Sequence, residues 1–342
     1  MKKYFLLLII LSILIIYFTN KNTINSDREK IIENQNSIEP NAFSGKLIEG
    51  NLFFKPVETE KDIERFNNLI FMGVNKDLLK KIDISILDEK EILDDEKLPI
   101  TKIDFELLGK TYWSFAYGKK NKSQKAILII PGSGSNQSSK IYMNDKDNYH
   151  YGLKHSFEKN FDVYVFIKPN EDYLAMHNTY NKINYDYIYN WHINKGGSYS
   201  FSYIVQSIAF SKYLKKNYDQ IVVAGLSQGG EAAFINSLYS DPDFSIISSG
   251  LSAYHKNLEF AGRGQIIIPN KFIYNEKILR ENFSDLKTNF FFSWGVNDTS
   301  EEYKRETKSN KTCNFFKKLI NLTCYYGEGH EFPVNAIEVH LN

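Results

Sequence analysis

Ten consecutive residues indicate the architecture of this chain: Ile221-Val222-Val223-Ala224-Gly225-Leu226-Ser227-Gln228-Gly229-Gly230. The four apolar residues predict a buried strand, and the small residues after Ser227 predict the start of a helix. A serine on so sharp a turn exposes its hydroxyl, and glycines two positions to either side avoid a collision with neighbouring backbone. The helix would also direct its first N–H groups toward the turn, which favours negative charge there. We therefore interpret Ser227 as a nucleophile.

The pattern Gly-x-Ser-x-Gly also arises by chance in glycine-rich turns, so its context decides its meaning. With a strand before it and a helix after it, this stretch resembles the nucleophile elbow of the α/β-hydrolase family. The resemblance implies a mostly parallel central sheet with helices on both faces, and a triad in the chain order serine, acid, histidine. The longer form from Gly225 to Gly230 is similar to that of carboxylesterases, dienelactone hydrolases and acetylxylan-esterase-like members.

An acid and a base follow later predicted strands in this order. The aromatic run 289–294 predicts a buried strand, and Asp298 comes just after it. A last short strand is predicted over 323–326, and His330 follows in a glycine-containing loop. His330 would accept the proton of Ser227, and Asp298 would fix the tautomer of the imidazole and stabilise its charged form.

Other residues compete for these two roles. Asp298 could instead cap a helix, and Asp241 and Asp243 are alternative acids, although Asp241 precedes a proline and so carries a turn signal. His340, in a predicted closing helix, is the alternative base. The remaining histidines are interpreted as structural: His150, His155, His177, His192 and His255.

A tetrahedral oxyanion needs backbone donors. The resemblance implies that one is the N–H of Gln228 and that another lies in the loop after an earlier strand, here 126–130. In that loop we expect the N–H of Ser133, with Gly134 as the alternative, and Pro131 stands where the family more commonly has histidine. The loop lacks the Gly-Lys-Ser/Thr ending of a P-loop, so no nucleotide cofactor is predicted.

The rest of the chain predicts one α/β domain over 45–342. Further strands are expected around 47–54, 103–117, 161–167 and 244–248, and the helix over 200–215 has apolar residues at i, i+3, i+4, i+7 and i+8. Continuous apolar strands that alternate with helices are typical of a mostly parallel sheet with both faces covered. Two loop insertions, at about 170–197 and 251–286, would shape the pocket.

Reaction sites in such sheets lie beyond the carboxyl ends of the strands. Ser227, Asp298, His330 and Ser133 all follow predicted strands at those ends. We therefore expect these four residues to converge at one edge of the sheet.

Residues 1–20 predict a membrane-targeting segment, because two lysines precede the apolar stretch 4–18. At about 1.5 Å per residue this stretch spans about 22 Å, less than the roughly 30 Å of a bilayer core, which favours a signal peptide. No small-x-small cleavage pattern follows, which favours an uncleaved anchor. Either case predicts an extracytoplasmic protein, periplasmic or at the cell surface, with 21–44 as a polar tether.

Composition and motif spacing argue against a nucleic-acid partner and a metal site. The formal net charge is +1, and no basic stripe with interleaved aromatic residues is present, so no nucleic-acid partner is predicted. No Cys-x-x-Cys or His-Glu-x-x-His spacing occurs, so no metal site is predicted. Cys313 and Cys324 could form a disulfide that ties a helix around 315–320 to the last strand, or could be two small buried side chains.

These patterns predict an exported or membrane-anchored serine hydrolase that requires no cofactor. Its substrate would be a small-molecule or carbohydrate ester, with acylated carbohydrate preferred. A peptidase, a thioesterase or an acyltransferase could use the same triad. The alternative from a different class is a non-catalytic hydrolase-fold binding module.

Overall fold

The computed structural model describes residues 83–94, 96–107, 110–121, 123–134, 136–148, 150–169, 171, 199–253 and 276–341. All of them belong to one compact unit of the chain, Phe53–Asn342. The predicted targeting segment and tether and the strand expected at 47–54 lie outside the described residues. So do all of the insertion at 170–197 except residue 171, and residues 254–275 of the insertion at 251–286. Within the described ranges, no helix has the length and apolar character needed to cross a membrane.

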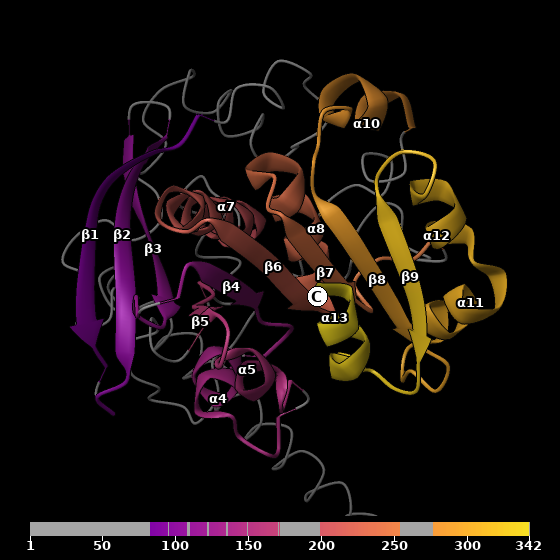
Figure 1. Cartoon of the computed structure of the whole chain (residues 1–342), viewed down its shortest axis with the longest axis horizontal. Coiled ribbons are helices and arrows are strands. Elements are labelled where there is room, and N and C mark those ends of the chain that lie inside the picture. Colours follow the sequence, from indigo (N-terminus) through magenta and orange to yellow (C-terminus); the bar gives the residue numbers. More distant parts are fainter. Residues whose placement is uncertain are drawn as a thin grey trace, which may run out of the picture. The chain divides into compact units, whose positions relative to one another are not determined.

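One sheet of nine strands forms the centre of the described part of the chain, in the order β1-β2-β3-β5-β4-β6-β7-β8-β9 (Figure 1). The strands are β1 Ser85–Leu93, β2 Pro99–Leu107, β3 Lys110–Tyr117, β4 Lys125–Ile130, β5 Asp162–Phe166, β6 Gln220–Leu226, β7 Phe244–Ser248, β8 Asn289–Gly295 and β9 Leu322–Gly327. Strands β1, β2, β3 and β5 pair antiparallel in that order, and every pair from β5–β4 to β8–β9 is parallel. The predicted mostly parallel sheet is confirmed.

Helices cover this sheet on both faces. They are α4 Gln137–Met143, α5 Leu153–Phe157, α7 Tyr199–Asn217, α8 Gln228–Ser240, α10 Glu276–Phe283, α11 Glu301–Ser309, α12 Lys311–Phe316 and α13 Val334–Leu341. In Figure 1, α7 and α8 lie on one side of the central strands, and α4 and α5 lie on the other. Every residue of β5, and all but the first residue of β4 and β6, is buried, as expected for strands covered on both faces. The expected α/β fold, a mostly parallel central sheet with helices on both faces, is confirmed.

The first three strands differ from the prediction. β1 was not predicted, because this edge strand is mostly exposed and its sequence, SILDEKEIL, contains no apolar run. The single region expected at 103–117 is two antiparallel strands, β2 and β3, with Leu107 opposite Lys110. Apolar residues alternate at 103, 105 and 107 in β2 and are nearly continuous over 112–117 in β3, so the sequence was interpreted as one strand region.

Cys313 and Cys324 form a disulfide with their Cα atoms 6.3 Å apart. It joins α12 to β9, the strand that leads into the loop of His330. The helix lies at Lys311–Phe316 and not around 315–320, so Cys313 is inside it.

Candidate active site

Ser227 occupies the turn between β6 and α8 with φ 58° and ψ −126°. Such a backbone conformation costs about 1–3 kcal/mol in a residue other than glycine and is concentrated at functional sites. Backbone hydrogen bonds hold the turn: Ser227 N–H donates to Ser248 O at 2.9 Å, and Ser227 O accepts from Gly230 N–H at 2.9 Å. The serine itself is partly exposed, so its hydroxyl stands at a turn that solvent or substrate can approach.

The glycines around Ser227 allow backbone segments to touch. A Cβ atom at Gly225 would lie 1.9 Å from Gly229 O, and a Cβ atom at Gly229 would lie 2.1 Å from Ile130 O. Real side chains do not reach such distances, so both positions require glycine. The contact at Gly229 places the end of β4, and with it the start of the loop that carries Ser133, against the first turn of α8.

Asp298 and His330 are in direct contact. His330 Nδ1 lies 3.0 Å from Asp298 Oδ1 and 2.9 Å from Asp298 Oδ2. The carboxylate also accepts from Ser249 Oγ at 2.6 Å and from Ser300 N–H at 2.8 Å. Burial raises the pKa of Asp298, but the hydrogen bonds from His330, Ser249 and Ser300 outweigh it, and the pKa is lowered. The carboxylate is therefore charged, and the proton between the two residues resides on Nδ1.

The loops that carry this pair lie side by side. Beyond the last paired residues of β8 and β9, Val296 N–H donates to Gly327 O at 2.9 Å and Asn297 N–H donates to Glu328 O at 2.7 Å. A Cβ atom at Gly295 would lie 2.2 Å from Gly329 O. The two loops thus continue the pairing of their strands at backbone distance.

Two consecutive serines at the end of β7 connect Ser227 to Asp298. Ser248 O accepts from Ser227 N–H, and the next residue, Ser249, donates from its hydroxyl to Asp298. Ser249 itself has φ 43°, a conformation that side chains rarely adopt. The elbow and the Asp298–His330 pair therefore lie at one edge of the sheet, beyond the carboxyl ends of β6, β8 and β9.

The competing residues lie toward the other edge. Asp243 Oδ2 accepts at 2.7 Å from the backbone N–H of the second residue of β6, and Asp241 Oδ1 accepts from N–H groups just before β8. His340 packs against Phe244, the first residue of β7, with ring centroids 5.7 Å apart. Asp298 Oδ1 also accepts from the N–H of Ser300, the N-cap of α11. The Asp298 side chain therefore contacts a helix start as well as His330, and the two interpretations from the sequence do not exclude each other.

His150, interpreted from the sequence as structural, lies beside the loop after β4. Its Nε2 accepts from Gly132 N–H at 3.3 Å, and its Nδ1 lies 2.9 Å from Asn148 Oδ1. Burial, together with the charges of Lys168 and His330, holds the pKa of His150 well below its usual value. The ring is therefore neutral, with its proton on Nδ1. Nothing in the sequence around His150 indicated this contact.

Two further residues near the site had no sequence signal. Tyr303 of α11 packs its ring against His330, with centroids 6.0 Å apart. Glu231 lies in the first turn of α8, and burial raises its pKa to about 8. The raised pKa favours the uncharged carboxyl, which adds no negative charge at the helix start.

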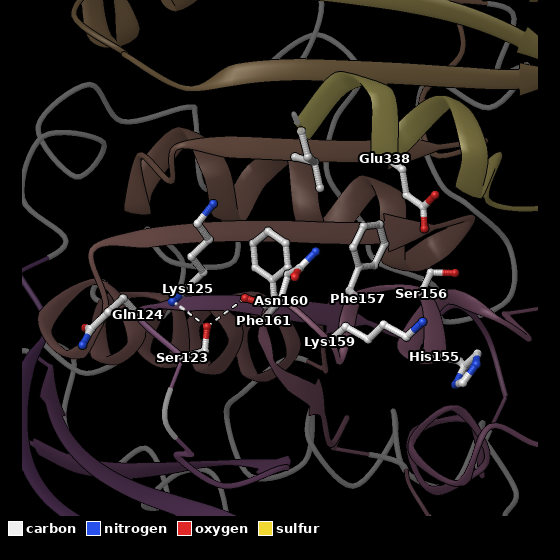
Figure 2. A pocket seen from close by; sticks show the side chains of 11 residues that line it. Ser123, Gln124, Lys125, His155, Ser156, Phe157, Lys159, Asn160, Phe161 and Glu338 are labelled. Atoms are coloured by element: carbon white, nitrogen blue, oxygen red, sulfur yellow. Dashed lines mark hydrogen bonds between the residues drawn. The ribbon is translucent and has the colours of Figure 1, made fainter.

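A surface pocket of about 610 Å³ lies elsewhere (Figure 2). Its lining includes Lys125 at the start of β4, Asn160 just before β5, and Glu338 of α13. Lys125 and Asn160 are at the amino ends of their strands, so the pocket is separate from the edge that carries Ser227. Among the described residues, no cluster of three or more His, Cys, Asp or Glu could hold a metal ion.

No protein-family model matches the chain, and no curated protein matches its sequence. Among solved structures, the matches include an esterase from Pyrococcus furiosus, with 16% identity, 86% of this chain and 92% of that chain covered, and a TM-score of 0.40. Acetyl xylan esterase 1 from Thermoanaerobacterium sp. matches with 12% identity, 84% and 94% covered, and a TM-score of 0.44. A glucuronoyl esterase from Caldicellulosiruptor kristjansonii matches with 13% identity, 85% and 89% covered, and a TM-score of 0.44. At these values, nothing about the substrate of this chain follows from the matches.

Proposed function

We propose that this protein is a serine hydrolase that cleaves an ester, with Ser227 as nucleophile, His330 as general base and Asp298 as the acid that orients the histidine. The observation that supports this most strongly is the contact between His330 Nδ1 and Asp298 at the same sheet edge as the strained serine. A buried charged carboxylate that holds an imidazole by Nδ1 leaves Nε2 to accept a proton.

The reaction has two halves. His330 Nε2 takes the proton of Ser227 while Oγ bonds to the ester carbonyl carbon, and the resulting imidazolium is stabilised by Asp298. The tetrahedral intermediate collapses, its bond to the alkoxy oxygen breaks, and His330 gives its proton to the departing alcohol. Water then loses a proton to His330 and attacks the acyl-enzyme, and the acid leaves as Ser227 regains its proton.

The oxyanion of each intermediate would be bound by backbone N–H groups of Gln228 and Ser133. Gln228 is the first residue of α8, where N–H groups lack helical partners and the helix dipole favours negative charge. The loop of Ser133 abuts that turn through the contact between Gly229 and the end of β4. Removal of one such donor in other hydrolases costs about 10²–10³ in kcat.

We propose an acylated carbohydrate as the substrate and an extracytoplasmic location for the enzyme, exported or anchored by residues 1–20. The apolar stretch 4–18 supports export, and the disulfide is typical of an oxidising compartment. Cell fractionation tests the location: we expect the protein in the membrane or extracytoplasmic fraction. Recovery in the cytosol with Met1 retained would contradict it.

Matched variants test the proposed roles of His330 and Asp298. The measurement is their hydrolysis of 4-nitrophenyl acetate and of acetylated sugars. His330→Gln and Asp298→Asn should each lose at least about a thousandfold in kcat, in the range of triad losses elsewhere. His340→Gln and Asp243→Asn replace the competing base and acid, and they should keep activity if they fold. Equal losses in both sets would contradict the assignment.

A further inference from the structure

Lys168 and Glu171 form an ion pair inside the protein, next to the loop after β4. Both are almost fully buried, at 0% and 2% side-chain exposure, and Lys168 Nζ lies 3.4 Å from Glu171 Oε1. Removing two charges from water is unfavourable, and apolar replacements of such pairs are often neutral or stabilising. Stability alone is therefore a poor reason for this pair.

Lys168 bonds to the loop itself. It follows β5, and its Nζ donates to the carbonyl oxygens of Gly132 and Gly134. Glu171 in turn accepts from the N–H of Ser138 in the first turn of α4 at 3.2 Å. The pair thus ties the loop to a neighbouring helix through buried polar contacts.

The geometry of the trans peptide shows in which direction the N–H of Ser133 points. In a trans peptide the C=O and the following N–H point to opposite sides. The peptide between Pro131 and Gly132 is held at both ends, because Tyr203 OH donates to Pro131 O while Gly132 N–H donates to His150. In the next peptide, Gly132 C=O faces Lys168, so the N–H of Ser133 is directed to the side away from Lys168.

We propose that Lys168 and Glu171 are positioning residues that hold this loop so that the N–H of Ser133 faces the oxyanion. This inference rests on the proposed function, because it concerns the same reaction. Burial lowers the pKa of Lys168 and raises that of Glu171, and the charge of each partly offsets the shift of the other.

The test uses the full chain and 4-nitrophenyl acetate. The double variant Lys168→Met with Glu171→Leu removes the pair without leaving an unpaired charge. We expect its kcat to fall by about tenfold to a hundredfold, a part of the loss seen when an oxyanion donor is deleted. KM should stay within about threefold of the wild-type value. Affinity for a boronic acid, which mimics the tetrahedral intermediate, should fall in parallel with kcat. A loss confined to thermal stability, or an unchanged kcat, would overturn the inference.

Lys215 provides a matched control. Its Nζ also donates to two carbonyl oxygens, those of Ser240 and Asp241, but at the far end of α8. Lys215→Met should leave kcat and boronic acid affinity unchanged. If Lys215→Met lowers kcat and boronic acid affinity as much as the double variant does, then losing any lysine that bonds to backbone carbonyl groups has this effect. The inference then fails.

Two further measurements separate the possible failures. If the double variant does not fold, Glu171→Gln carries the test, since glutamine retains an acceptor for Ser138. It should lower kcat by at least about threefold at constant KM, and an unchanged kcat would overturn the inference. Ser227→Ala tests the proposed function separately: retained hydrolysis in that variant refutes the function, whereas lost hydrolysis with a fully active double variant refutes the positioning role alone.

Discussion

Ser249 Oγ lies 2.6 Å from Asp298 Oδ2, and this hydrogen bond joins the end of β7 to the carboxylate that holds His330. Because Asp298 is fully buried, each donor to its charge contributes to keeping it ionised. Ser249 also occupies a strained backbone position, with φ 43°. The surrounding structure therefore maintains this contact against a local conformational preference.

Ser249→Ala should lower kcat by about tenfold. A hydrogen bond to a charged group contributes about 1.5–3 kcal/mol, and part of that stabilises the carboxylate facing the imidazolium. Loss of the bond raises the pKa of Asp298, so the deficit should grow as the pH is lowered. A pH profile of kcat checks both effects. Ser240→Ala is the control, because Ser240 donates to the neutral amide of Asn236 at the far end of α8, and it should leave kcat unchanged.

Gly229→Ala should destabilise the protein by about 3 kcal/mol or more, because the added methyl group would overlap Ile130 O. Unfolding in urea gives the free energy directly. Gly327→Ala is the comparison: its nearest contact would be the Tyr325 side chain at 3.3 Å, which can move. A Gly229→Ala protein as stable as Gly327→Ala would contradict the close backbone approach at the elbow.

Replacing both Cys313 and Cys324 by serine should lower the free energy of unfolding by about 3 kcal/mol in the chain-entropy model. The same loss should follow when the wild-type protein is unfolded in the presence of a reductant. Urea unfolding with and without reductant measures it. A reductant that changes the wild-type curve and the double-serine curve equally would show that the disulfide does not contribute.

Glu231→Gln should stabilise the protein at alkaline pH. The unfolded chain releases the Glu231 proton near pH 4.5 and the native chain only near pH 8, so native stability falls as the pH rises between these values. Glutamine removes this dependence. Melting temperatures should be similar for both proteins at pH 5, and the variant should melt higher at pH 9. Parallel curves across this range would refute the raised pKa of Glu231 in the native protein.

The sequence predicted the parts of the site that follow apolar strands in chain order. Ser227, Asp298 and His330 each lie just beyond such a strand, and local patterns are enough to identify that position. By contrast, the roles of Ser249 and Lys168 depend on which strands are neighbours in the sheet and on their register. Neither is visible from residues close by in the chain.

The same limit applies to the fold. Strands β4 to β9 contain apolar or aromatic runs that are visible in the sequence. By contrast, β1 is an exposed edge strand held by pairing with β2, and its charged residues interrupt any apolar run. The competing acid Asp243 could be set aside only when its hydrogen bond at the start of β6 placed it at the other edge.

The measurement that tests the central claim most directly is labelling of the purified full-length protein with a fluorophosphonate, followed by peptide mass spectrometry. An activated serine attacks this phosphorus electrophile, and an ordinary hydroxyl does not. We expect one modified residue, Ser227, with no labelling in Ser227→Ala and strongly reduced labelling in His330→Gln. Labelling of a different serine, or no labelling of a folded wild-type protein, would contradict the assignment of Ser227 as an activated nucleophile.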